Sequence, residues 1–160
     1  MRIIARQLVD GRDNEMDFKK AYSPAWTHYF DKDKEYVFKE DQCGSWQYNF
    51  NASKNQLNRV KKLCEEAVLN GVVVEVKFTN EDAMFLKGKG KCCFYCNGDD
   101  VAAHKRILEF FIKNNMVMKD DFGNIRNMAF RYDSTAQKRP KGSVPIQMGD
   151  FVNLKTAIFK

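Results

Sequence analysis

The sequence predicts an α+β fold, chiefly because a strand–helix–strand pattern occurs twice. The first copy covers residues 48–78 and the second residues 92–119. Strand, helix cap, helix, turn and second strand all keep one offset of 44 residues, so that Phe50, for example, is matched by Phe94. Two such units joined by a hairpin form the ferredoxin-like, split βαβ arrangement, in which both helices cover one face of an antiparallel sheet.

The first unit contains a helix with clear boundaries. Ser53 and Gln56 form a capping-box pattern that opens a helix, and Asn70-Gly71 supplies the left-handed residue that ends one. Apolar residues at helical spacing predict a packed face made of Leu57, Val60, Leu63, Cys64, Ala67 and Val68. Residues 72–78 alternate, which predicts a half-buried strand with Val72, Val74, Val76 and Phe78 inward and Glu75 and Lys77 outward.

The second unit repeats this pattern with different residues. Asp99 or Asp100 is expected to cap a helix that ends at Asn114-Asn115. Its predicted apolar face consists of Ala103, Ile107, Leu108 and Phe111. A short strand is expected at residues 116–119. Between the two units, residues 87–91 are expected to form the flexible basic tip of a hairpin.

The flanking segments predict further strands. A strand is expected at residues 2–9, and residues 26–30, 35–39 and 45–50 are expected to form an N-terminal meander. Residues 119–124, rich in Asp and Gly, predict a turn before another strand at residues 125–132. That last hairpin behind a helix leaves a winged-helix-like α+β fold as the alternative.

A chain of 160 residues with 44% hydrophobic content is expected to form one domain. We expect N-terminal strands over residues 1–45, the duplicated core over 46–133, and a basic loop with a tail that docks on the core over 134–160. The sequence shows no signal peptide or apolar run long enough for a membrane span, and its five cysteines have no framework spacing. These features indicate a cytoplasmic protein with reduced thiols, whose oligomeric state stays open.

Motifs for catalysis are mostly missing from the sequence. With only His28 and His104, no H-x-H, H-E-x-x-H or serine-triad spacing can be assembled. We interpret His104, on an apolar helix face, as a structural residue satisfied by a hydrogen bond. The stretch at 88–91, Gly-Lys-Gly-Lys, lacks the spacer and the hydroxyl residue of a phosphate-binding loop. No catalytic residue and no cofactor is therefore predicted.

One C-x-x-C pair, Cys93 and Cys96, is the half-site of many zinc centres. In a strand, however, side chains alternate, so these two thiols should point to opposite faces of the sheet. Cys43 and Cys64 are isolated in the sequence and supply no second pair. We therefore predict no metal site and interpret the cysteines as small buried hydrophobic residues.

Glu75-Val76-Lys77 matches the short E-x-K fragment of metal-dependent nucleases, in which the carboxylate holds magnesium and the lysine steadies the attacking water. Alternating charge on the exposed face of any strand gives the same triplet. A nuclease that uses Glu75 and Lys77 is therefore the third hypothesis.

Charge and sheet geometry together predict contact with nucleic acid. The chain has a net charge of +6, and if the helices cover one sheet face, the other face carries aromatic and basic side chains. An aromatic ring beside lysines can stack on a base while the ammonium groups neutralise phosphates. The predicted binding residues on the sheet, its basic tip and the basic arm are Lys77, Lys87, Lys89, Lys91, Tyr95, Lys138, Arg139 and Lys141.

The leading hypothesis is a small non-catalytic accessory protein that binds nucleic acid or a nucleoprotein complex. The length, the bias towards Lys and Asn, the basic loops and the lack of catalytic residues suit a protein of a mobile element or phage. The alternative is a protein-binding inhibitor of a host nucleic-acid enzyme, of the anti-CRISPR kind, that uses its aromatic N-terminal hairpins and its tail. The expected partners are nucleic acid or a protein that processes it, and no membrane.

Overall fold

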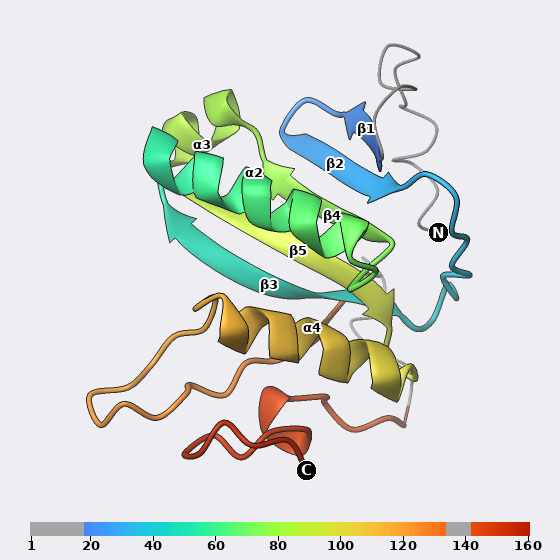
Figure 1. Ribbon diagram of the computed structural model, residues 1–160, viewed down its shortest axis with the longest axis vertical. Coiled ribbons are helices and arrows are strands. Elements are labelled where there is room, and N and C mark those ends of the chain that lie inside the picture. The colour runs from blue at the N-terminus through green and yellow to red at the C-terminus, as the bar shows by residue number, and fades with distance from the viewer. Residues whose placement is uncertain (1–17, 134–141) are drawn as a thin grey trace.

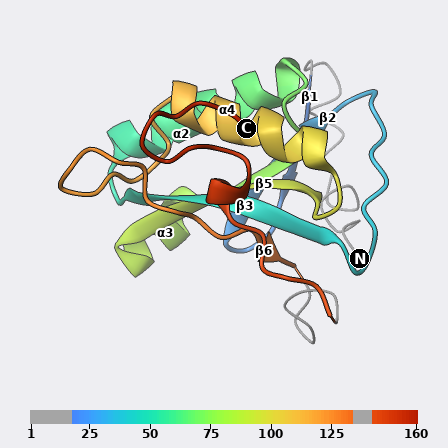
Figure 2. The same ribbon diagram turned by 90° about the horizontal axis from the view of Figure 1, so that it is seen from below.

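The protein is an α+β structure built on one open antiparallel sheet, which confirms the predicted class. The computed structural model describes residues 18–133 and 142–160. The six strands lie in the order β1-β2-β4-β5-β3-β6. Figures 1 and 2 show two helices, α2 and α4, covering one face of this sheet, with the C-terminal segment packed beside α4. The strand predicted at residues 2–9 lies outside the described residues.

The connections between the elements range from a single residue to long segments such as the one between α4 and β6. In chain order the elements are β1 (Phe18–Tyr22), β2 (Trp26–Asp31), β3 (Cys43–Asn51), α2 (Lys54–Leu69), β4 (Glu75–Thr79), α3 (Glu81–Lys87), β5 (Lys89–Asn97), α4 (Val101–Lys113), β6 (Arg131–Tyr132) and a 3₁₀ helix, η2 (Met148–Asp150). Within the described residues, no helix is both long and apolar enough to cross a bilayer.

The pairing of β3 with β5 is the longest in the sheet and extends in register from Cys43↔Asn97 to Asn51↔Lys89. Gly90 makes this pairing possible near α3, because a Cβ at that position would collide with the ring of Phe50. On the other side of β5, β4 pairs antiparallel and in turn binds β2. The β1–β2 hairpin therefore joins the sheet through β4 and not through β3.

The predicted boundaries of both long helices are confirmed. The Ser53 hydroxyl accepts a hydrogen bond from the Gln56 backbone N–H at 3.1 Å, and the Asp100 carboxylate accepts one from that of Ala103 at 3.1 Å. Asp100, and not Asp99, is thus the cap of α4. The apolar face predicted for each helix is buried, and both faces belong to the same hydrophobic core as Val76, Phe78 and Phe94 of the sheet.

A polar network in this core is fully satisfied. The Trp46 indole Nε1–H donates to Nδ1 of His104 at 2.9 Å, so Nε2 carries the imidazole proton and donates to the carbonyl of Gly98 at 2.8 Å. The His104 ring also stacks on Phe151 of the C-terminal segment. His104 is fully buried, so both ring nitrogens need partners. The structural interpretation of His104 is confirmed, with two strong hydrogen bonds instead of one.

The second half of the repeat differs from the prediction. Residues 116–119 do not join the sheet. Asn115 has a positive φ of 54°, after which the Met116 backbone N–H donates to Phe111 of the preceding helix. The Met118 carbonyl then accepts from Arg126, and Lys119 bridges Ile125, so this segment pairs within its own hairpin. The turn expected at residues 119–124 is present, but only Arg131 and Tyr132 of the predicted strand 125–132 form a strand.

Residues 35–39 also differ from the prediction, because they are extended without a partner strand. The side-chain amide of Asn97 makes hydrogen bonds of the kind that a partner strand would otherwise make. Its oxygen accepts from the Lys39 backbone N–H at 2.9 Å, and its nitrogen donates to the Val37 carbonyl at 2.7 Å. The chain from residue 32 to residue 42, which we call the strap, is held against the end of β5 in this way.

Burial of His104 predicts a pH-dependent stability. Burial disfavours the imidazolium and holds the pKa of His104 below its usual value, so the unfolded chain binds more protons than the folded protein below about pH 6.5. The free energy of unfolding should fall as the pH drops from 7.5 to 5.5, by up to about 1.4 kcal/mol per pH unit.

Urea denaturation at several pH values tests this expectation. The variant His104→Gln should be less stable at pH 7.5 but should have a shallower pH dependence, because its amide does not titrate. Equal pH dependence in the natural protein and in His104→Gln would contradict the assignment of this effect to His104.

Candidate nucleic-acid interface

The face of the sheet opposite α2 and α4, which we call the helix-free face, has two parts of different character. Around Tyr95 it is apolar and closed, because Tyr95 packs with Cys43 and Cys93 under Trp26 and Phe38. Towards α3 it is polar and accessible. The apolar part lies near the strap, and the polar part lies where β3 ends and β5 begins.

We call the accessible part the polar strip. It consists of Gln47, Asn49 and Asn51 on β3 and Lys89 and Lys91 on β5. Strand alternation places these side chains on the same face, and the register pairs Asn49 with Lys91 and Asn51 with Lys89 directly across the two strands. Neither strand carries an acidic residue. Two ammonium groups therefore lie beside two amides with no carboxylate from either strand to neutralise them.

The backbone under the strip is held by a side chain of β4. The Thr79 hydroxyl accepts a hydrogen bond from the Lys91 backbone N–H at 3.0 Å and donates one to the Lys91 carbonyl at 3.2 Å. This hydroxyl continues the β4–β5 ladder beyond its last paired residues, Phe78 and Cys92. The lysine is thus presented from a fixed strand and not from a flexible hairpin tip.

Residues 81–87 form the helix α3, whereas the sequence predicts only a hairpin between the two units. Asn80 caps its first turn and Gly88, at a φ of 73°, ends it. Lys87 is exposed in the last turn, beside Phe85 and Leu86, which are also exposed. Asn80 followed by two acidic residues, with glycine eight residues after Asn80, is a helix signal that the sequence contained. Lys87, Lys89 and Lys91 do lie at one end of the sheet.

Lys77 and Tyr95 do not lie on an open surface. The Lys77 ammonium lies 4.1 Å from the centre of the Trp26 ring and 5.8 Å from that of Tyr95, so the half-buried lysine is held in cation–π contacts. Tyr95 is only 2% exposed. A base cannot stack on a ring that is already covered, so the expected role of Tyr95 as a stacking platform needs correction. The amides of Asn49 and Asn51 in the polar strip are exposed instead.

The basic arm predicted from Lys138, Arg139 and Lys141 lies outside the described residues. Next to it in sequence, Arg131 of β6 is exposed and is paired in register with Ser45 of β3. Strand alternation therefore places Arg131 on the face of the polar strip. Sequence reasoning missed this residue, because a two-residue strand carries no periodic signal.

The residues of the nuclease hypothesis are also placed differently from the expectation. Glu75 was predicted to point outward, but it is buried, at 3% exposure. It shares the helix-free face with Lys77, and His28 is the cross-strand neighbour of that lysine. Among the described residues, no group of three or more His, Cys, Asp or Glu is arranged to hold a metal ion. A phosphodiester has no direct path to the Glu75 carboxylate in this arrangement.

All five cysteines are free thiols in the interior. Cys93 lies on the helix-free face and Cys96 in the core under the helices, as strand alternation predicts for this pair. Burial raises the pKa of Cys93 to about 11, although Lys77 offsets part of that effect. Burial also raises the pKa of Cys92 and of Cys96 above the usual range. These three groups are neutral thiols at physiological pH.

No protein-family model matches the chain, and no curated protein is similar to it in sequence.

Burial of the thiols predicts slow alkylation of the native protein. At pH 8 roughly one part in a thousand of a thiol with a pKa near 11 is ionised, and only the thiolate reacts quickly. Intact-mass measurement after iodoacetamide treatment should find no adduct on the folded protein and five adducts on the protein unfolded in urea. Rapid single modification of the folded protein would show that one thiol is accessible.

Proposed function

We propose that this is a small accessory protein that binds nucleic acid through the polar strip. We also propose that β3–α2–β4 and β5–α4–β6 correspond to the two halves of a ferredoxin-like split βαβ core, to which the β1–β2 hairpin and the C-terminal segment are added. The strand order β4-β5-β3-β6 and the antiparallel pairings agree with this proposal.

The observation that carries the functional proposal is the in-register pairing of Asn49 with Lys91 and of Asn51 with Lys89. Ammonium groups bind phosphates and release counterions, whereas amides can both donate to and accept from base edges. Lys87 and Arg131 extend the positive charge to either side of the strip. A row of basic and amide side chains along two strands suits an extended nucleic-acid strand laid across it.

The variant Lys89→Ala/Lys91→Ala tests the proposal directly. Each lysine that contacts a phosphate should contribute about one unit to the slope of log affinity against log salt. The double variant should therefore bind single-stranded DNA or RNA, or duplex, more weakly and with a slope reduced by about two. Fluorescence anisotropy at several salt concentrations measures both quantities.

Lys62→Ala is the matched control, because Lys62 is exposed on α2, on the other side of the sheet. It should leave affinity and slope almost unchanged. Equal effects of the control and the double variant, or no binding by the natural protein to any of these nucleic acids, would overturn the proposal.

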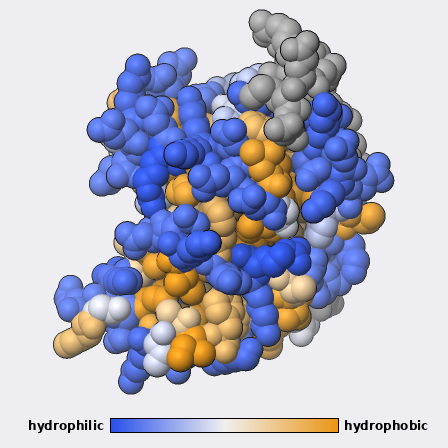
Figure 3. All heavy atoms as spheres, in the orientation of Figure 1, coloured by the Kyte–Doolittle hydropathy of each residue, from blue (hydrophilic) through white to orange (hydrophobic). Residues whose placement is uncertain are grey.

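A second candidate function, a protein-binding inhibitor of a nucleic-acid enzyme, is favoured by a different surface. Figure 3 shows hydrophobic side chains gathered over α4 and the C-terminal segment, whereas the α2 side is mostly hydrophilic. Ile158 is 66% exposed there, and a cavity of about 540 Å³ lies beside it. The cavity is lined by Lys105, Glu109, Ile112, Lys113, Ala157 and Phe159. An apolar patch with a polar border is typical of a protein contact.

Ile158→Asp tests this second function, since the substitution places a charge in the patch without filling or emptying the core. A protein partner captured by the natural chain after nuclease treatment should be lost from Ile158→Asp by tenfold or more. Phe122→Asp is the control, because Phe122 is 89% exposed on a separate hairpin. Retention of the partner by Ile158→Asp would exclude this surface.

A further inference from the structure

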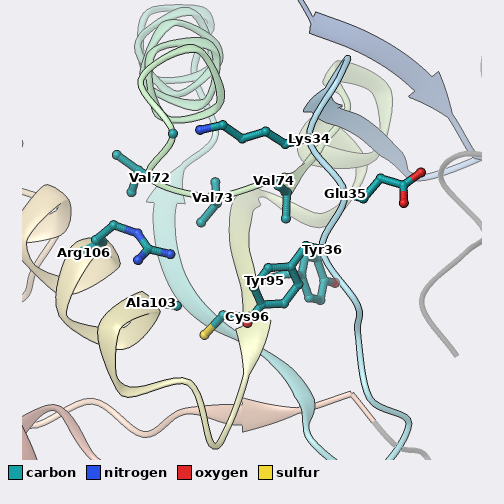
Figure 4. Close-up of a pocket in the computed structure, with 11 residues that line it drawn as sticks. Lys34, Glu35, Tyr36, Val72, Val73, Val74, Tyr95, Cys96, Ala103 and Arg106 are labelled. Carbon is teal, nitrogen blue, oxygen red and sulfur yellow. The ribbon is translucent and has the colours of Figure 1, made fainter.

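A cavity of about 340 Å³ opens between the strap, the α2–β4 loop, the end of β5 and α4 (Figure 4). Its volume lies at the lower end of the range of ligand pockets, roughly 300–1,000 Å³. The segments that enclose it are Lys34–Tyr36, Gly71–Val74, Tyr95–Cys96 and the α4 residues Ala103 and Arg106. The cavity lies beside the last residues of β5 and the loop that leads into β4, apart from the polar strip.

The inner wall of the cavity is apolar and uncharged. Val73, Cys96 and Ala103 are buried and form this wall together with Tyr95. Burial, with a further contribution from Asp100, raises the pKa of Cys96, so its thiol is neutral. Hydrocarbon in this space would remove apolar surface from water on both partners.

Tyr36 makes one side of the cavity rigid. Its hydroxyl donates to the Asp100 carboxylate at 2.7 Å and accepts from the Asn97 backbone N–H at 3.0 Å. Its ring also packs against Phe38 in the strap. The strap is thereby joined to the first turn of α4, so the opening between them is preformed and does not need to be created by a ligand.

Two of the three charged residues that line the cavity are basic. Arg106 extends from α4 with its guanidinium directed into the space below Val72 and Val73, and Lys34 crosses the opposite side towards the end of α2 (Figure 4). The Lys34 ammonium lies close to Gly71, so near that a Cβ there would approach it to 2.9 Å. The Glu35 carboxylate is directed away from the cavity (Figure 4). Within the described part of the chain, Arg106 forms no salt bridge.

We propose that this cavity binds a small organic anion, with its apolar body against Val73, Ala103 and the tyrosines and its acidic group on Arg106. Lys34 supplies a second positive charge at the opening. The planar guanidinium can donate hydrogen bonds to two oxygens of a carboxylate or a phosphate at once. A neutral ligand does not offer such a pair of charged oxygens. The ligand is thus an aryl or branched alkyl carboxylate or phosphate monoester.

Four probes distinguish the contribution of the ligand's apolar body from that of its acidic group. Phenyl phosphate and benzoate carry both a ring and an anion, inorganic phosphate carries only the anion, and benzyl alcohol carries only the apolar body. NMR titration that follows the signals of Val73 and Ala103 measures binding at the cavity itself. One or both aryl anions should bind at least tenfold more tightly than inorganic phosphate and benzyl alcohol, and the tighter of the two identifies the acidic group.

Arg106→Gln should weaken the tighter aryl anion at least tenfold, while Arg126→Gln, which removes an equal charge on the exposed 118–126 hairpin, should not. Val74→Phe should block the signal changes by filling the cavity, and its folding is checked by the same spectra. Equal binding by Arg106→Gln and Arg126→Gln would overturn the proposal, as would aryl anions that bind no more tightly than their separate halves.

Discussion

The in-register pairing of β3 with β5 is the interaction on which the rest of the structure depends. It joins two interior strands of the sheet, and each of the two long helices begins within a few residues of the end of one of these strands. A slip of one residue would send every side chain of one strand to the other face. A slip of β5 would take Phe94 out of the core and turn Lys89 and Lys91 into it. Packing of the core and the position of the polar strip are therefore two results of one register.

The long helices could be predicted because their signals are local. A cap, an apolar stripe and a terminating asparagine are contained in one stretch of chain, and they do not depend on what packs against it. A strand differs because it needs a partner. Residues 116–119 have the composition of a strand, but the backbone turns at Asn115 and the segment pairs with its own hairpin. The strap shows the same limit, since its backbone groups are satisfied by the Asn97 amide.

The candidate interface was likewise predictable only where its signals are local. Alternation alone brings Lys89 and Lys91 to one face, because both residues belong to one strand. The sequence of the strand does not show which residues from other segments cover that face. Tyr95 is closed off by Trp26 and Phe38, from segments without a periodic relation to β5, so its burial appears only in three dimensions. Glu75 is buried for the same kind of reason, opposite Phe30 in the neighbouring strand.

The attachment of the β1–β2 hairpin through β4 determines an order of events during synthesis. The hairpin is local and can close as soon as residue 31 is available, but its neighbour in the sheet follows only after β3 and α2. Its docking must wait for this long loop to close, which is the slow step in sheets with distant pairings. Until then Tyr29 lacks its ring contact with Phe78 of β4 on the nascent chain. The β1–β2 hairpin is thus synthesised early but gains its partner strand late. A ribosome-bound chain that stops before residue 79 therefore carries an unpaired strand edge on β2.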